Sequence, residues 1–397
     1  MRAVTDSVPP SAWTADDARA VTQLMLLAVA LRVATALVAF FVNATFPLQR
    51  PEQFTVLAET HLFWDTFARN DAGWYYGIAS HGYQWVEGGR NNLAFFPAYP
   101  LLMGVAGRLF GGTQADTYFG GIVVAWVASI AAIGFVYGVA RLDLPPERAW
   151  HAALLTFVFP FAFFFGVVYS ESLFVLGLAG AVFGLRTRRW LLGAVCGALM
   201  TATRVNGVMA VPALVWLAWV SAPPTRAGRL RGLAAGLATG LGFAGYCVYN
   251  WRVTGDPFEW YHAITRWGYY PGATVAGNPV VALVTNLATR PYDYLVTEHA
   301  APYDLLNGLF PLVMVATLPW LWRRLGAGYA LLIAANLALP LSSGQFEGLG
   351  RYSAVLFPFQ IWVVAAAGRP GRAVIYAGYG LFYVLALTLF TTLHPIF

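Results

Sequence analysis

Residues 21–43 read VTQLMLLAVALRVATALVAFFVN, an apolar run with a single charged residue, Arg32, near its middle. A helix of about 20 apolar residues crosses the roughly 30 Å of hydrocarbon in a bilayer. Eleven further apolar runs follow, near 93–110, 118–140, 150–168, 172–185, 190–203, 205–220, 230–251, 305–322, 327–342, 351–367 and 373–393. This succession predicts an all-α polytopic membrane protein.

The composition agrees with lipid as the main solvent of the chain. Of the 397 residues, 59% are hydrophobic and only 11% are charged, whereas a soluble domain has about a quarter of its residues charged. The net charge of +6 comes from arginines at the ends of apolar runs, so it indicates orientation in a membrane and no nucleic-acid partner. Residues 1–20 are polar and lack the pattern of a signal peptide, and we interpret them as a cytoplasmic tail.

Arginine clusters give the expected orientation, because short loops rich in Arg face the cytoplasm. The clusters are Arg141/Arg148, Arg186/Arg188/Arg189, Arg226/Arg229/Arg231, Arg323/Arg324 and Arg369/Arg372. All of them face inward only if one upstream run does not cross the membrane. The run at 93–110, with Pro97, Pro100 and Arg108, fits a helix at the interface or a re-entrant helix. We therefore expect about eleven spanning helices, with two long outer loops at about 44–117 and 252–304.

The first outer loop offers a carboxylate in a suggestive position. The sequence predicts a short helix from Ala72 to Ser80, ended by Gly82, with Asp71 at its N-terminus. Asp71 either caps free backbone N–H groups or serves as a general base, and spacing alone favours the cap. Glu171 presents the same choice between capping the next helix and binding substrate, and Ser170 would cap equally well.

Two arginines lie at the predicted outer membrane edge. Arg204 and Arg351 either bind a phosphate through the two parallel donors of the guanidinium or extend to the interface. Arg32, in the middle of a span, is expected to pair with an internal acid or carbonyl and to have a structural role. Gly255-Asp256-Pro257 predicts a turn in the second outer loop.

We expect no cofactor and no metal. The six histidines lack zinc-binding spacing, and Cys196 and Cys247 lie in apolar runs that do not favour a disulfide. Asp65 and Asp71 share one loop and could hold a divalent cation. Magnesium sites usually combine several carboxylates with substrate phosphates, so this alternative is the weaker one.

Several short motifs occur in an order that resembles one protein family. They are Arg69-x-Asp71-Ala-x-x-Tyr75, Ile78-Ala79-x-x-Gly82-Tyr83, Phe95-Phe96-Pro97-x-x-Pro100-Leu101, Tyr169-Ser170-Glu171-x-Leu173-Phe174 and Ala202-Thr203-Arg204-x-Asn206-Gly207. Together they resemble the second mannosyltransferase of glycosylphosphatidylinositol-anchor assembly and its bacterial relatives. This family belongs to the GT-C superfamily of glycosyltransferases, which use polyprenyl-phosphate sugars. The resemblance covers roughly residues 20–367.

The resemblance implies a single GT-C transmembrane domain over 21–397, whose outer loops form the active-site face. It implies inverting transfer of a sugar, mannose in this family, with Asp71 as the general base. The residues expected to bind substrate are Arg204, Arg351, Glu171, Tyr75, Asn206, Asp65 and His81. The family has Trp before the loop aspartate where this chain has Asn70, and a Trp64-Asp65 pair occurs six residues earlier. Asp65 therefore stays an alternative base.

The partners implied are a polyprenyl-phosphate-linked sugar, a lipid or glycan acceptor and membrane lipid. The expected place is a bacterial inner membrane, with the active site facing the periplasm or the cell exterior. A secondary transporter or lipid flippase is the alternative, but the charged residues lie in outer loops and not at mid-membrane, with Arg32 as the exception. An inactive scaffold is a further alternative, which only Asn70 favours.

Overall fold

The computed structural model describes residues 13–49, 62–266, 288, 302–342, 346, 348–394 and 396. Among these residues the regular elements are helices and no strand occurs, so the predicted all-α class is confirmed. In chain order the elements are α1 (Ala15–Thr45), α3 (Leu62–Asp65), α4 (Ala72–His81), η1 (Asn92–Ala94), α5 (Ala98–Phe110), α6 (Gln114–Arg141), α7 (Pro146–Phe157), η2 (Ala162–Gly166), α8 (Glu171–Arg186), α9 (Trp190–Thr201), α10 (Asn206–Ser221), α11 (Arg226–Ala238), α12 (Leu241–Thr254), α13 (Glu259–Arg266), α16 (Pro302–Leu325), α17 (Ala327–Leu341), α18 (Leu349–Ala354), α19 (Pro358–Ala366) and α20 (Arg369–Thr391).

Each of the twelve predicted apolar runs overlaps at least one of these helices. Four helices are long and apolar enough to cross a membrane, namely α1, α6, α16 and α20, and α11 with α12 makes a fifth if this pair, bent by 45°, is one span. The chain is therefore a membrane protein with several apolar helices. Helices α7 to α10 and α17 have only 12 to 16 residues, about 18–24 Å of rise, so the number of eleven crossings stays a prediction.

Helix α1 begins earlier than its apolar run predicts. Thr14 and Asp17 form a capping box, in which each side chain accepts a hydrogen bond from the backbone N–H of the other residue. Such a box satisfies N–H groups that the first turn leaves free. The helix therefore starts at Ala15, inside the segment interpreted as a tail, of which residues 1–12 lie outside the described part of the chain.

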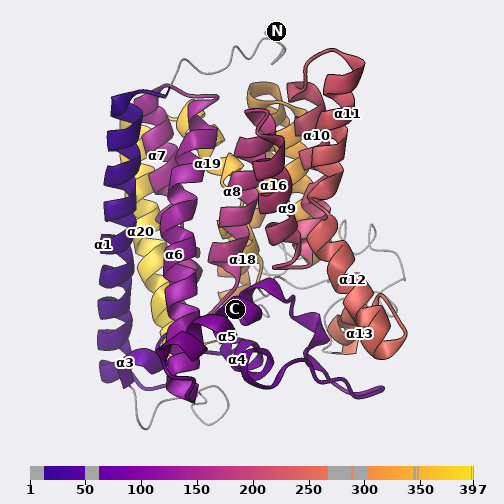
Figure 1. The fold of residues 1–397 in the computed structure, drawn as a ribbon. Helices are drawn as coiled ribbons and strands as arrows, with labels where there is room; N and C mark the ends of the chain where they lie inside the picture. The colour runs from indigo at the N-terminus through magenta and orange to yellow at the C-terminus, as the bar shows by residue number, and fades with distance from the viewer. Residues whose placement is uncertain are drawn as a thin grey trace.

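The run at 93–110, which we predicted not to cross the membrane, contains the short helix α5. Helix α5 has 13 residues, which at about 1.5 Å of rise each reach about 20 Å. Its glycines allow close packing, since a Cβ added at Gly104 would lie 2.8 Å from the Ala79 carbonyl oxygen of α4 and one at Gly107 would lie 2.6 Å from Thr117 of α6. Figure 1 shows α4 and α5 together at the end of the bundle opposite the start of α1, in agreement with an interfacial element.

Ion pairs gather the arginine-bearing helix ends at the other end of the bundle. Arg141 pairs with Asp17 at 2.7 Å, Arg186 with Asp143 at 2.5 Å and Arg372 with Glu147 at 3.2 Å. At the far end of α1, Asn43 accepts a hydrogen bond from Arg69 of the first outer loop at 2.9 Å. Asp17 and Asn43 are about 39 Å apart along a straight helix. The arginine-rich helix ends and the first outer loop thus lie at opposite ends of the helix bundle, as the predicted topology requires.

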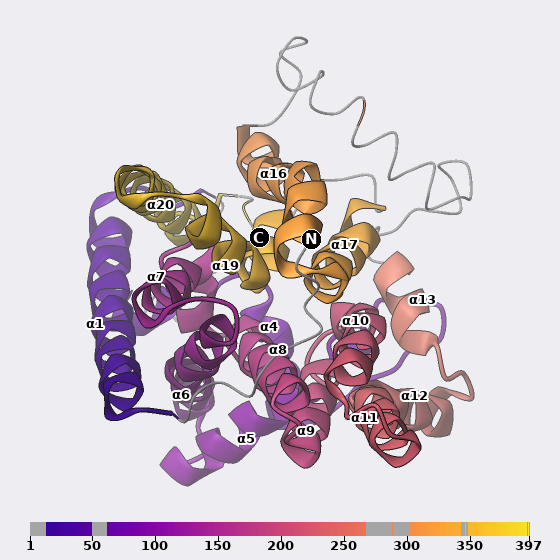
Figure 2. The same ribbon diagram turned by 90° about the horizontal axis from the view of Figure 1, so that it is seen from above.

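Helix α8 is largely enclosed by the bundle, with 13 of its 16 residues buried. Gly177, Gly180 and Gly184 face α9, and a Cβ at any of them would lie within 2.8 Å of an α9 residue or the turn before it. Small residues of this kind let two helices approach closely in a membrane protein. Seen from above, α8 lies inside the ring of helices that includes α1, α20 and α10 (Figure 2). The buried start of α8 is Glu171.

Arg32 has the structural role predicted for it. The side chain is only 1% exposed in the middle of α1. Its guanidinium donates to the Ala162 carbonyl oxygen at 3.0 Å and to the Tyr383 hydroxyl at 3.4 Å. These contacts join α1 to η2 and α20, and they give a mid-span charge internal hydrogen-bond partners in place of water.

Candidate active site

The helix predicted after Asp71 is present as α4, which ends one residue later than expected, at His81, followed by Gly82 with φ of 77°. Asp71 occupies the N-cap position, but its side chain makes no capping hydrogen bond. Its backbone is helical, with φ −61° and ψ −16°, whereas a capping residue normally has extended backbone. The cap interpretation favoured by spacing is therefore wrong, and the carboxylate is directed to another partner.

That partner is Arg351, which comes from α18 near the other end of the chain. Arg351 Nη1 donates to Asp71 Oδ2 at 2.7 Å. The same guanidinium approaches a second carboxylate, with its Nε 3.8 Å from Glu171 Oε1. It also lies 5.4 Å from the ring centroid of Tyr169 and 6.0 Å from that of Tyr352. One arginine thus stands between the two acids that the sequence singled out.

Glu171 also does not act as a helix cap. Its Oε1 accepts from Arg204 Nη1 in a buried ion pair. The Ser170 hydroxyl makes no capping bond either and shares a hydrogen bond with the Tyr75 hydroxyl at 3.0 Å. The Arg204 guanidinium lies 4.6 Å from the ring centroid of Tyr352. The structure therefore unites Asp71, Arg351, Glu171 and Arg204, which we call the charge cluster.

The four side chains of the charge cluster differ in how much of each is exposed to solvent. Side-chain exposure falls from 23% at Asp71 and 15% at Arg351 to 9% at Arg204 and zero at Glu171. Two carboxylates and two guanidiniums balance in charge, which is the condition under which buried charges are tolerated. A molecule that enters this site would meet Asp71 and Arg351 first, with Glu171 and Arg204 behind them.

Tyrosines complete the cluster, and only one of them was predicted. Tyr75 is buried, and burial together with the nearby Glu171 raises the pKa of its phenol, so the hydroxyl stays protonated. The Tyr169 hydroxyl accepts a hydrogen bond from the Asp71 backbone N–H at 3.2 Å. Tyr352 lies under both guanidiniums. The sequence signal for Tyr169 was its place in the motif that contains Glu171, and Tyr352 directly follows Arg351 in the sequence.

The alternative base, Asp65, has a different setting. Asp65 and Arg69 form an ion pair in which both side chains are completely buried, and Arg69 also donates to Asn43 of α1. The pair links the first outer loop to the end of α1. An acid sealed in this way is not open to an acceptor hydroxyl, so the geometry favours Asp71. The two carboxylates considered for a divalent cation are thus engaged with separate arginines.

The backbone conformation at position 70 favours Asn where the related family has tryptophan. Its backbone has φ of 51°, in the left-handed region. Asn adopts this region more readily than most residues with a side chain. Both polar atoms of its amide are buried without a hydrogen-bond partner among the described residues. Asn70 therefore lies in the turn that places Asp71 at the start of α4.

Two other predicted substrate residues have contacts outside the charge cluster. Asn206, the first residue of α10, is buried and donates to Asn336 of α17 at 3.2 Å. His81 ends α4 on the surface, and its ring lies 6.1 Å from that of Tyr76. In the described part of the chain Asn206 therefore joins two helices, and His81 lies at a helix end.

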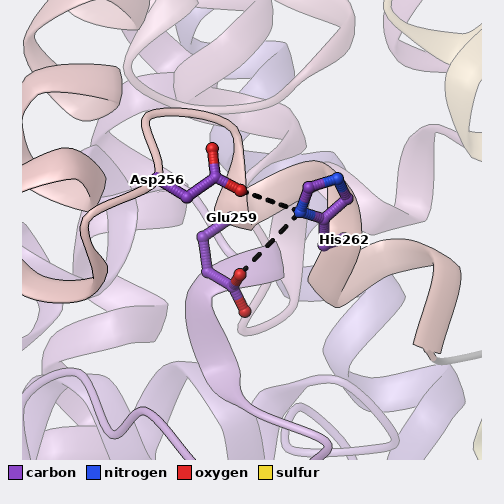
Figure 3. Close-up of side chains that lie close together, drawn as sticks. All are labelled: Asp256, Glu259 and His262. Atoms are coloured by element: carbon purple, nitrogen blue, oxygen red, sulfur yellow. Dashed lines mark ion pairs between the residues drawn. The ribbon is translucent and has the colours of Figure 1, made fainter. Parts of the chain in front are cut away.

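One group in the described residues has the composition of a metal site (Figure 3). It begins in the predicted turn, where Gly255 has φ of 81°. Asp256 and His262 pair at 2.8 Å, and Glu259 lies 3.9 Å from the same ring nitrogen. Glu259 also accepts hydrogen bonds from Asn91 and Arg266. These ion pairs and hydrogen bonds satisfy the group internally, and half of His262 is exposed.

Comparison with known sequences identifies a relationship over the first half of the chain. The family described as Mannosyltransferase (PIG-V) matches residues 19–219 of the 397. A relative from Cricetulus griseus, GPI alpha-1,6-mannosyltransferase 2, is 32% identical over 158 residues. This alignment covers 36% of the chain and only 30% of the relative's length. The family match, residues 19–219, contains Asp71, Glu171 and Arg204, and Arg351 lies beyond it.

Among solved structures, the chain is similar to the oligosaccharyltransferase of Archaeoglobus fulgidus in the apo form. That likeness has a TM-score of 0.46 and 12% identity, and it covers 93% of this chain and 56% of the other. The same archaeal enzyme, AglB, in complex with an inhibitory peptide and a dolichol-phosphate, gives a TM-score of 0.43 and 13% identity, with 92% and 56% coverage. Likenesses at this level do not by themselves establish a shared function.

Proposed function

We propose a function from the premise that this chain belongs to the Mannosyltransferase (PIG-V) family. The protein transfers a mannosyl group from a polyprenyl-phosphate donor to a hydroxyl of a lipid or glycan acceptor, with inversion at the anomeric carbon. The reaction takes place on the non-cytoplasmic face of a bacterial inner membrane, in a GT-C arrangement of helices. The observation that carries the proposal is the charge cluster, which joins a partly exposed acid to two arginines.

In the proposed reaction Asp71 acts as general base. It accepts the proton of the acceptor hydroxyl while that oxygen forms a bond to the anomeric carbon. The bond from the anomeric carbon to the phosphate oxygen breaks on the opposite side, and its electron pair leaves with the polyprenyl phosphate. The departing phosphate gains negative charge, which the guanidiniums of Arg351 and Arg204 stabilise. No strong acid is needed, because phosphate is already a good leaving group.

The position of the cluster supports the proposed face of the membrane. Arg69, which precedes Asp71 by two residues, binds Asn43 near the end of α1. Arg141, the last residue of α6, pairs with Asp17 at the start of α1. Arginine-bearing helix ends face the cytoplasm as a rule, so the charge cluster would face away from it.

Arg32 was the one sequence feature that favoured a transporter. Its guanidinium is bonded to the Ala162 carbonyl and the Tyr383 hydroxyl. These bonds account for the mid-span charge as a link between helices, so no described contact of Arg32 supports a transport pathway.

The test is a transfer assay with purified protein in detergent micelles. The protein is incubated with polyprenyl-phosphate mannose and a membrane lipid extract, and products one hexose heavier are sought by mass spectrometry. We expect such products with the wild-type protein and none with Asp71→Asn. A transporter has no defined activity in micelles, because no two compartments exist. A wild-type protein that fails with mannose and other polyprenyl-phosphate sugars would refute the proposal.

A further inference from the structure

Arg351 has two competing tasks in the proposed reaction. It is to hold the donor phosphate, yet in this structure its Nη1 bonds the carboxylate of the base, Asp71, at 2.7 Å. Each guanidinium N–H group points in a fixed direction, so a group that bonds a carboxylate does not serve a phosphate at the same time. Either the phosphate uses other donors or Arg351 must change partner.

We propose that Arg351 exchanges Asp71 for the donor phosphate, so that the donor frees its own base. This inference rests on the proposed function and adds an order to it, with the donor bound before the acceptor is activated. While Arg351 Nη1 donates to Asp71 Oδ2, that carboxylate oxygen is occupied by a hydrogen bond. After the exchange, the same oxygen is open to accept a hydrogen bond from the acceptor hydroxyl.

Unsatisfied atoms around Arg351 indicate the second position of its guanidinium. Arg351 Nε and Glu171 Oε2 are buried and have no hydrogen-bond partner among the described residues. Arg351 Nε already lies 3.8 Å from Glu171 Oε1, too far for a hydrogen bond. Buried polar atoms without partners are uncommon and call for an explanation. A rotation of the guanidinium away from Asp71 and toward Glu171 would give both groups a bond.

The surroundings of Arg351 permit this movement. Its guanidinium lies over the rings of Tyr169 and Tyr352, 5.4 Å and 6.0 Å from their centroids. Attraction to a ring face has little directional preference along that face, so the cation keeps it while it shifts. Asp71, with 23% of its side chain exposed, can be solvated by water or by an acceptor hydroxyl after release.

The other half of the charge cluster is expected to stay in place. Glu171 is completely buried and bonded to Arg204, and a buried carboxylate stripped of its arginine would be left uncompensated. Glu171 therefore acts as a positioning residue that holds Arg204 and receives Arg351. The exchange involves only the outer pair, Asp71 and Arg351.

The experiment measures the affinity for a short-chain polyprenyl monophosphate by titration calorimetry in detergent. Wild type is compared with Asp71→Asn, Arg351→Gln and the double variant. Because Asp71→Asn removes the competitor for Arg351, we expect about fivefold tighter binding, the size of one partly exposed ion pair. Arg351→Gln should bind about tenfold more weakly, since one charged phosphate contact is lost. The double variant should bind as Arg351→Gln does, because the gain requires Arg351.

Asp256→Asn is the matched control. It removes the same charge from a carboxylate that is 36% exposed and lies outside the charge cluster, and its affinity should stay within about twofold of wild type. Thermal unfolding in detergent checks that each variant is folded. Asp71→Ala serves as a second way to remove the carboxylate if the Asn variant does not fold.

Two results would overturn the exchange. The first is unchanged or weaker probe binding by Asp71→Asn and Asp71→Ala. The second is an equal gain in the Arg351→Gln background, which would show that the Asp71 charge merely repels the phosphate. Sugar transfer by the wild type reports separately on the proposed function. A wild type that transfers mannose while its variants show either result refutes the exchange alone, and a wild type that neither transfers mannose nor binds the probe refutes both.

Discussion

Two aspartates six residues apart in the first outer loop form ion pairs with arginine that differ in almost every physical respect. Asp65 pairs with Arg69, four residues away, and both side chains are completely buried. Asp71 pairs with Arg351, 280 residues away, and the two side chains are 23% and 15% exposed. The first pair is anchored to α1 through Asn43, whereas the second shares its arginine with Glu171.

The difference shows how the same two residue types acquire different roles. A sealed ion pair is costly to break, because either partner alone would be a buried uncompensated charge. A partly exposed pair loses little when it opens, since water or another ligand replaces the lost partner. The sealed pair is therefore suited to holding the loop against the bundle. The open pair can rearrange during a reaction, and four predictions test this division.

The largest effect is expected at the open pair. Asp71→Asn removes the proposed base and should lower the transfer rate about a thousandfold. Its free energy of unfolding should change by less than about 1 kcal/mol, because the lost ion pair is partly exposed. Initial rates of mannosyl transfer and thermal unfolding in the same detergent measure the two quantities. Turnover near that of wild type would remove Asp71 from the role of base.

The same substitution at the sealed pair should have the opposite signature. Asp65→Asn leaves Arg69 buried without a carboxylate and should destabilise the protein by about 3–5 kcal/mol. The protein that remains folded should retain transfer activity within about tenfold of wild type, because Asp65 does not act on substrate in this proposal. Unfolding midpoints and rates normalised to folded protein test this. A stable but inactive Asp65→Asn protein would make Asp65 the better candidate for the base.

A smaller effect is expected when the charge at position 351 is kept but its geometry is lost. Arg351→Lys preserves one positive charge but cannot donate two parallel hydrogen bonds to a phosphate. We expect the rate of transfer to fall about tenfold to a hundredfold, with the protein still folded. Steady-state kinetics with the donor as the varied substrate measure this loss. Full activity with lysine would show that the phosphate needs only a point charge there.

The smallest effect concerns the turn between the two pairs. Asn70 has φ of 51°, so Asn70→Ala should cost about 1 kcal/mol of stability through backbone strain. Asn70→Gly should be nearly neutral, since glycine adopts this conformation freely. Unfolding midpoints of the two variants decide the point. Equal midpoints would mean that the side chain of Asn70 matters and not its backbone.

Much of the fold could be predicted from local patterns along the chain. A bilayer requires long apolar runs, so the twelve apolar runs in the sequence predicted where helices occur. Arg32 needed an internal partner wherever the helices packed, and it has one. The short helix after Asp71 and the turn at Gly255 follow from residue preferences that act over a few positions. Helix ends were less certain, because the capping box that starts α1 at Ala15 lies outside the apolar run.

The candidate site was predicted as a set of residues but not as an arrangement. Local spacing favoured a helix cap for Asp71 and left Glu171 open between a cap and a substrate-binding acid. The sequence cannot show that the backbone of Asp71 is helical or that an arginine 280 residues away reaches it. Nor does it show that Asp65 is sealed while Asp71 is open. The sequence by itself determined a helical membrane protein, because long apolar runs bounded by charged residues follow one another along the chain. Only the tertiary structure decided which acid meets which arginine, because ion pairs between distant segments depend on how the helices pack.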